Sequence, residues 1–490
     1  MEAQLAERDQ RVEELQGQLL AASRQLYGQK SEQQRPRRRP RVDPVERARR
    51  RKRDPEERRE AAARARAANR AARGQLAVED ISIPVPAEQQ RCPHCGDEVA
   101  LQEVGGGRVT TVYEFVPAHF VQRRYHQQVL ACPRCDHIVS APAPDKPIEK
   151  GLYGASLVAH VVASKCADAL PIHRLARRLG RQGLAIGRST LNDLFHAAAG
   201  LLRPLRDRML GLVAGLWVVF ADETTMPVQA PERTRTAYLW TFIGRTGEGE
   251  DEGALVTFRF APSRSGETPS AVLGKSAGYL VVDGYTGYNV VCTPKCRKRG
   301  GCWSHCRRNF FDALPTAPEA QAALDLIGAL YEVEYEAAAR GILGTAEHLA
   351  LRRAASTPVL KRLKLWLREQ KPLHTPKSPM GKAIRYAQRQ WRALLRFLRE
   401  ARVPLDNNVS ERQLRAAALG RKNFLFVGHD KAGDNLAVLY SLVSSCIAND
   451  VNPEEYLADV LVRVHHHPQS RIDELLPHRW KKLFAVVAAA

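Results

Sequence analysis

Two acidic residues stand directly after short apolar runs in this 490-residue sequence. Asp222 follows the run at 216–221, and Asp283 follows the run at 279–282. Such runs predict buried strands, and a carboxylate just past a strand lies at the rim of the sheet, where ligands usually bind. Two neighbouring acids there stay ionised only with cations between them, and oxygen ligands of this kind suit Mg²⁺ or Mn²⁺. The alternative is that either Asp is an ordinary turn residue.

A third acid is available in the segment PLDNNVSER at 404–412. Residues 406–410 are types that cap helices, and Glu411 would then lie in the first helical turn. We therefore predict that Glu411 completes a carboxylate site with the two Asp residues.

Two C-x-x-C motifs, Cys92–Cys95 and Cys132–Cys135, bracket segments that read as strands. In a reducing compartment such pairs are more often metal ligands than disulfides. Cys92, Cys95, Cys132 and Cys135 together match a zinc ribbon holding one structural Zn²⁺, and a redox dithiol role is the weaker alternative.

A second cysteine group has the spacing C-x3-C-x5-C-x3-C. Its members are Cys292, Cys296, Cys302 and Cys306. A second zinc site and free thiols divided between a loop and the core both remain open for this group, because the spacing is not a standard one.

The elements that would position these residues change in character along the chain. Four strand-like runs occupy 216–221, 236–243, 254–260 and 279–282, and long amphipathic helical patterns follow at about 315–400. Strands followed by helices predict an α/β domain that carries a helical insertion.

A helix-turn-helix pattern precedes that domain. A helical pattern at 172–179 ends at a glycine-containing turn, and Ser189 or Thr190 is placed to cap a second helix. Arg188 and Asn192 would stand at the start of the recognition helix. An ordinary helical hairpin is the alternative.

The net charge is +22, from 75 Lys+Arg and 53 Asp+Glu. Residues 35–73 carry 17 basic and 6 acidic residues, so a net +11 falls in this segment. A solvated linker is one interpretation, and a phosphate-binding arm is favoured by the size of the charge. No apolar run reaches 18 residues and no secretory signal is evident, so we expect a soluble cytoplasmic protein whose partner is DNA rather than a membrane.

Heptad spacing of apolar residues marks 1–27 as a short helix, either a dimerising coiled coil or a helix that docks on its own protein. The predicted organisation is a coiled-coil helix at 1–31, a basic arm at 32–75, a zinc ribbon at 76–146, a helix-turn-helix-like region at 147–210, a catalytic domain at 211–430 with its insertion, and a helical region at 431–490.

Several motifs, in the same order along nearly the whole chain, closely resemble the DDE transposases of the insertion sequence 66 family. They are RQLYGQKSE at 24–32, SKCADALP at 164–171, ADET at 221–224, VDGYTGYN at 282–289, CWSHCRRNF at 302–310, LDNNVSERQLRAAALGRKNF at 405–424 and HPQSRIDELLP at 467–477.

The resemblance implies a ribonuclease H-like catalytic domain in which Asp222, Asp283 and Glu411 hold two Mg²⁺ or Mn²⁺ ions. It implies metal-dependent cleavage and strand transfer at the terminal repeats of a bacterial insertion sequence, with target DNA as the second substrate, in a nucleoid-associated protein. It also implies small accessory proteins as partners, and we expect a homo-oligomer. A catalytically inactive DNA-binding remnant or regulator is the alternative, although all three acids are present. Candidate DNA contacts in these motifs are His305, Arg307, Arg308, Arg412, Arg421 and Lys422.

Overall fold

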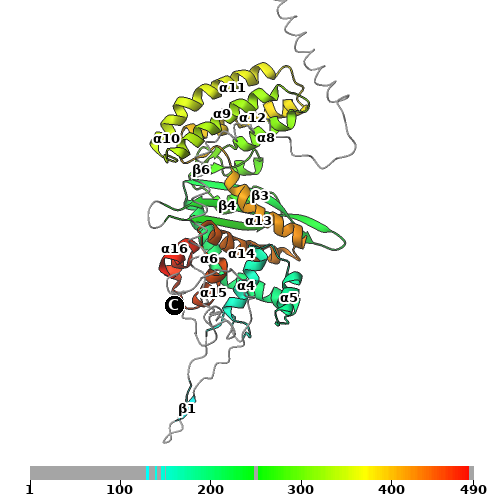
Figure 1. Cartoon of the computed structure of the whole chain (residues 1–490), viewed down its shortest axis with the longest axis vertical. Coiled ribbons are helices and arrows are strands. Elements are labelled where there is room, and N and C mark those ends of the chain that lie inside the picture. Colours follow the sequence, from blue (N-terminus) through cyan, green and yellow to red (C-terminus); the bar gives the residue numbers. More distant parts are fainter. Residues whose placement is uncertain (1–128, 132–137, 141–144, 149–150, 248–251, 485–490) are drawn as a thin grey trace, which may run out of the picture. The chain divides into compact units, whose positions relative to one another are not determined.

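The described part of the protein is built around one mixed five-stranded sheet with helices on both sides (Figure 1). The structure is a computed structural model and describes residues 129–131, 138–140, 145–148, 151–247 and 252–484. The strands are β3 Val218–Gln229, β4 Thr234–Arg245, β5 Ala254–Ala261, β6 Gly278–Val281 and β7 Arg297–Gly300, in the spatial order β5-β4-β3-β6-β7. Strands β5, β4 and β3 pair antiparallel, whereas β3, β6 and β7 pair parallel.

The four strand-like runs of the sequence form β3, β4, β5 and β6, as predicted. One detail of the prediction is wrong, because β3 does not end before Asp222 but continues to Gln229. The polar residues beyond Asp222 remain in strand conformation because β4 pairs with them throughout, from Phe220–Ile243 to Gln229–Thr234. What ends near Asp222 is the parallel pairing with β6, whose last pair is Phe220–Val281.

One side of the sheet is covered by helices from both ends of the described chain (Figure 1). These are α4 Ala155–Cys166, α5 Ile172–Arg181, α6 Arg188–Gly215, α14 Asp430–Ala448, α15 Pro453–Arg463 and α16 Pro477–Leu483. Their apolar faces share one core with the sheet, to which Leu205 and Met209 of α6 and Leu439 of α14 contribute fully buried side chains. The predicted caps Ser189 and Thr190 do not begin α6. Its N-cap is Gly187, without a side-chain cap.

The other side is covered by the helical insertion (Figure 1). It contains α8 Trp303–Ala313, α9 Ala320–Ala339, α10 Ala346–Leu351, the π-helix η4 Arg352–Ser356, α11 Thr357–Gln370, α12 Pro379–Leu394 and the short helix η5 Arg396–Leu398. The helices predicted at about 315–400 are therefore present. A second core, formed around Trp303, Phe310 and Ile384, joins them to β6.

Three further helices connect these layers: α7 Glu267–Leu273, η3 Thr286–Val290 and η6 Gln469–Leu475. Helix α13, Asn408–Phe424, follows the insertion directly and packs on β3 and β4. No helix in the described ranges is long and apolar enough to cross a membrane.

Of the predicted ribbon, the structure describes a short antiparallel pair, β1 Val129–Ala131 and β2 Ile138–Ser140, which flanks the second C-x-x-C motif in the sequence. The predicted coiled coil at 1–31, the basic arm at 32–75 and the zinc ligands Cys92, Cys95, Cys132 and Cys135 lie outside the described residues.

Candidate active site

The register of β3 and β6 brings the first two candidate acids together. Val218 pairs with Tyr279 and Phe220 with Val281, so the same register continued by two residues sets Asp222 beside Asp283. Side chains alternate along a strand, and those of Phe220 and Val281 contact the core under the insertion. Both carboxylates therefore leave the sheet on the side of the helical insertion.

The environment of Asp222 opposes its charge. Burial is the main reason that the pKa of Asp222 is raised from 3.8 to about 7, and the carboxylates of Glu223, Asp283 and Glu411 raise it further. The backbone N–H of Glu223 donates to Asp222 Oδ1 at 2.9 Å and acts in the opposite direction. A cation close to these carboxylates would lower the pKa of Asp222 again, because it would favour the charged form that burial and repulsion oppose.

Asp283 begins the turn that follows β6. Its Oδ1 accepts a hydrogen bond from the backbone N–H of Tyr285 at 2.9 Å, which is the bond of an Asx turn and fixes the carboxylate beside the sheet edge.

Asn407 brings the third candidate acid to this place. Its Nδ2 donates to the carbonyl of Ala221 at 2.8 Å, and its Oδ1 accepts from Ser410 Oγ at 3.0 Å. Since Asn407 is the N-cap residue of α13, the first turn of that helix is fixed next to Asp222, and Glu411 lies in that turn. Asn407 is 1% exposed, and sequence analysis had treated it only as one of several possible caps.

The start of α8 lies against the same turn. The backbone N–H of Trp303 donates to the carbonyl of Leu405 at 2.8 Å, and that of Asn407 donates to Cys302 Sγ at 3.3 Å. His305 Nδ1 is 3.7 Å from Glu411 Oε1 and 3.3 Å from Cys302 Sγ. His305, a predicted DNA contact, is therefore a neighbour of the candidate acids.

Glu223 was not singled out from the sequence, although it directly follows Asp222. Because β3 alternates, it points to the opposite face of the sheet, where its side chain is 2% exposed. Tyr288 donates its hydroxyl to Glu223 Oε2 at 2.5 Å, and Arg264 Nε donates to Oε1 at 2.7 Å. Burial raises the pKa of Glu223 and these two bonds oppose the rise. Both oxygens are occupied, so Glu223 anchors β3 rather than joining the carboxylates.

The other predicted DNA contacts near this site differ in their exposure. Arg307 and Arg308 are exposed on α8, and Arg412 and Lys422 are exposed on α13. Arg421 instead donates to the side chains of Thr224 and Thr225 and to the Thr225 carbonyl, which ties α13 to β3.

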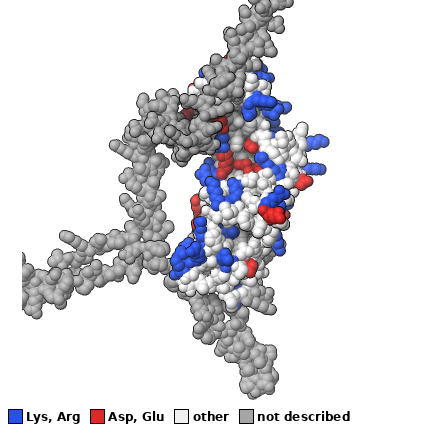
Figure 2. Space-filling view, turned by 90° about the vertical axis from the view of Figure 1, so that its right-hand side faces the viewer, with Lys and Arg blue, Asp and Glu red and all other residues white. Residues whose placement is uncertain are grey.

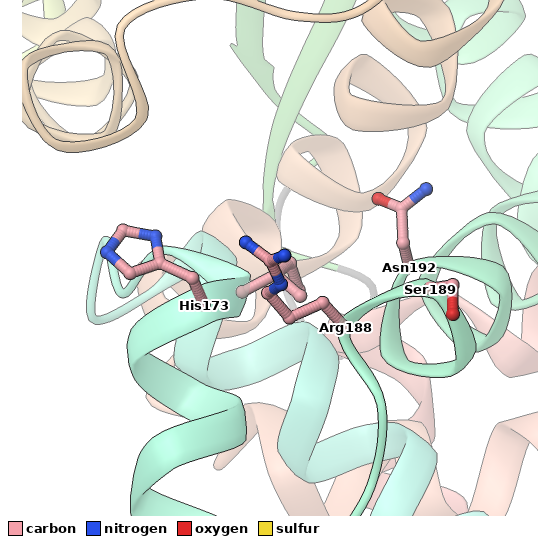
Figure 3. A pocket seen from close by; sticks show the side chains of 5 residues that line it. His173, Arg188, Ser189 and Asn192 are labelled. Atoms are coloured by element: carbon pink, nitrogen blue, oxygen red, sulfur yellow. The ribbon is translucent and has the colours of Figure 1, made fainter.

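The predicted recognition residues lie at the tip of α6. Arg188 and Asn192 are exposed and, with Ile172, His173 and Ser189, line a shallow hollow of about 600 Å³ between α5 and α6. Figure 3 shows Arg188 between His173 and Asn192 at the beginning of α6. The remaining cations of α5 are Arg174, Arg177, Arg178 and Arg181, and α5 contains no acid.

The second cysteine group does not converge on one point. Cys292 and Cys296 are partly exposed in the loop before β7, whereas Cys302 and Cys306 are buried at the start of α8, and all four are free thiols. Within the described ranges, no three His, Cys, Asp or Glu side chains are close enough to hold a metal ion as they stand.

One face of the described part combines both signs of charge. Figure 2 shows a patch of Asp and Glu side chains near the middle of this face, with Lys and Arg side chains gathered above and below it. Such a surface suits an anionic ligand. The Lys and Arg side chains attract it directly, and bound metal cations would contact it at the acidic patch.

Comparison with known sequences gives matches along most of the chain. Residues 150–435 match the model of the transposase IS66 family, residues 441–478 match the IS66 C-terminal element, and residues 89–136 match the zinc-finger binding domain of transposase IS66. Two similar proteins from Sinorhizobium fredii, strain NBRC 101917 / NGR234, are named uncharacterized protein y4hP and uncharacterized protein y4jD. The first is 30% identical over 414 residues, which cover 80% of this chain and 74% of that protein. The second is 31% identical over 414 residues, which cover 81% of this chain and 80% of that protein.

Proposed function

Because the chain belongs to the IS66 family of transposases, we propose that it cuts the terminal repeats of a bacterial insertion sequence and joins them to target DNA. Two observations support this proposal: the register of β3 and β6, which continued by two residues would set Asp222 beside Asp283, and the Asn407–Ala221 hydrogen bond, which holds the first turn of α13, with Glu411, next to β3. We infer a ribonuclease H-like fold for residues 211–430, supported by three antiparallel strands that continue into a parallel pair.

The chemistry of the three acids suits a divalent cation, because their donors are all oxygens, as Mg²⁺ and Mn²⁺ prefer. Burial and, after it, the neighbouring carboxylates raise the pKa of Asp222, and a cation would favour its charged form. Two ions held here would activate the attacking oxygen and stabilise the leaving oxygen of an in-line displacement at phosphorus. We assign Asp222 and Asp283 as the central ligands and Glu411 as the ligand that completes one site.

The protein's own groups then position the substrate and the ligands. The attacking groups are water and afterwards a DNA 3′-hydroxyl, so no protein nucleophile is required. His305, whose Nδ1 lies 3.7 Å from Glu411 Oε1, orients the Glu411 carboxylate. Arg307 and Arg308, which follow His305 on α8, bind DNA phosphates. Arg412 and Lys422 contact phosphate from the exposed face of α13, which Arg421 holds against β3.

Other parts of the chain bind DNA and metal outside the catalytic centre. The match at residues 89–136 contains Cys92, Cys95, Cys132 and Cys135, which supports one structural Zn²⁺ held by these four thiolates. The basic arm at 32–75 supplies affinity independent of DNA sequence, and Arg188 and Asn192 supply selectivity for the element ends. The heptad pattern at 1–27 supports the expectation of a homo-oligomer, and accessory proteins of the same element are expected as further partners.

The decisive experiment replaces each acid without changing its shape. Asp222→Asn, Asp283→Asn and Glu411→Gln, each in the full chain, should lower Mg²⁺-dependent cleavage and joining of a duplex from the flanking element DNA at least about a hundredfold. Binding of that duplex should remain. Asp312→Asn, an exposed acid on α8, is the matched control and should retain activity.

The results test both the assignment of the three acids and the proposed catalytic activity. Full activity in one of the three variants would remove that residue from the site. Wild-type protein that binds the duplex but does not cleave it with Mg²⁺ would instead support the alternative of a catalytically inactive regulator.

A further inference from the structure

A second hollow, separate from that at α6, lies between the sheet edge and the insertion. It has a volume of about 540 Å³ and is lined by the turn after β6, the loop before β7, β7 itself, the end of α12 and η5. Besides Arg297, five basic residues line it: Lys298, Arg389 and Arg392, which are exposed, and Arg299 and Arg396, which are partly buried. No Asp or Glu is among its lining residues.

Within the described part of the chain, no acidic side chain is paired with these cations. None of the five takes part in an ion pair with any residue that the structure describes. Arg299 donates to the carbonyl of Tyr285, and Arg396 Nε is buried without a hydrogen-bond partner among the described residues. Five like charges around one hollow repel each other, so the arrangement is stabilised by an anion that enters it.

Arg297, which also lines the hollow, differs from these five cations because its guanidinium group is fully hydrogen-bonded within the fold. It is 1% exposed, and it donates to the carbonyls of Tyr279, Ala214 and Leu216 and to Ser276 Oγ. Every guanidinium nitrogen of Arg297 is therefore used inside the fold. The five cations of the hollow have no comparable set of partners.

The hollow is adjacent in the chain to the candidate active site. Gly284, the residue after Asp283, belongs to its lining. A Cβ on Gly284 would lie 2.8 Å from Tyr386 Cε2 and 3.3 Å from Gln390 Nε2, so α12 packs directly on the turn that carries Asp283. A strand whose reacting phosphate lies at the carboxylates therefore reaches the hollow with a neighbouring phosphate.

From this placement we infer that the hollow binds the phosphate backbone of the DNA strand that flanks the reacting phosphodiester. The inference rests on the proposed function. It gives the helical insertion a role, because Arg389, Arg392 and Arg396 come from its last two helices. The insertion supplies the positive charge that a polyanion needs beside three carboxylates.

The test removes the three exposed heads together: Lys298→Gln, Arg389→Gln and Arg392→Gln. The matched control removes equal charge from α11, at residues that do not line the hollow: Lys361→Gln, Lys364→Gln and Arg368→Gln. Both full-length triple variants are titrated, without added Mg²⁺, with a duplex of the flanking element DNA at several salt concentrations. Binding is also mapped by interference from ethylated phosphates.

Loss of three phosphate contacts lowers the salt slope by about 2.7, because each contact contributes about 0.9. The affinity advantage of the wild type over the hollow variant should then shrink about 40-fold between 50 and 200 mM salt. Interference should disappear at phosphates next to the cleavage position and persist elsewhere. The α11 variant should keep the wild-type interference pattern.

A hollow variant with the wild-type slope and the wild-type interference pattern would overturn the inference. That outcome is distinct from failure of the proposed function, which shows as wild-type protein without Mg²⁺-dependent cleavage. Circular dichroism of both variants separates lost contacts from lost folding, and a folded single variant, Arg389→Gln, should lower the slope by about 0.9.

Discussion

Replacing Asp222 by Asn should stabilise the protein when no divalent cation is present. The pKa of Asp222 is raised from 3.8 to about 7 in the folded state, chiefly by burial. The folded state thus binds this proton more tightly than the unfolded state, so stability falls as pH rises from about 4 to about 7. At 1.36 kcal/mol per pKa unit, the loss is about 4 kcal/mol, and the uncharged amide of the Asp222→Asn variant does not incur it.

Thermal unfolding followed by tryptophan fluorescence measures this difference, because all six tryptophans lie between residues 217 and 480. The roughly 330 residues described between 151 and 484 imply an unfolding entropy of about 0.7 kcal/mol per kelvin, so 4 kcal/mol corresponds to about 6 °C. Without added Mg²⁺, the Asp222→Asn variant should melt about 6 °C above the wild type at pH 8. Near pH 4 the two melting temperatures should converge.

Added Mg²⁺ should raise the melting temperature of the wild type at pH 8 and leave that of the variant nearly unchanged. Asp312→Asn removes an exposed acid and should show neither effect. A difference between wild type and Asp222→Asn that stays constant from pH 4 to pH 8 would refute the reasoning, because it would mean that Asp222 titrates alike in both states.

Two further changes test the framework around the site. Arg352→Ala should destabilise the insertion by about 3–5 kcal/mol in urea unfolding, because it leaves the Glu334 carboxylate without its guanidinium partner and frees backbone carbonyls such as that of Val403; a loss below 1 kcal/mol would contradict this. Asn407→Ala should cost about 1–3 kcal/mol and lower cleavage more than DNA binding, since the Ala221 carbonyl loses its partner and Glu411 its anchor; equal losses in both assays would argue against a positioning role.

Local patterns were sufficient for most of the architecture. Apolar runs predicted β3 to β6, and amphipathic spacing predicted the long helices at about 315–400, because burial of one face determines both patterns. Strand β7 was missed because its sequence, Arg-Lys-Arg-Gly, has no apolar alternation. It is an edge strand, and edge strands commonly carry charged residues.

The candidate site, like the fold, was predictable in part. Asp222 and Asp283 stand out in the sequence because each follows an apolar run, but their common level depends on the register of two parallel strands. The position of Glu411 depends on a contact between residues 186 positions apart, Asn407 and Ala221. No local pattern encodes such a contact. The cations of the hollow are likewise scattered over β7, α12 and η5 and meet only in the folded chain.

Helix α6 connects the candidate recognition residues with the catalytic sheet. Its 28 residues, with Pro204 inside, correspond to about 42 Å of helix, from an exposed first turn to a last part whose Leu210 and Val213 belong to the core under the sheet. Arg203 holds its middle to Asp434 and Asn435 of α14. If the N-terminal end of α6 binds the element end, the length of the helix sets the distance between the recognised sequence and the cleavage position. That distance fixes the number of base pairs between them. Inserting one residue near the tip would turn the reading residues by about 100°, so recognition and cutting would fall out of phase.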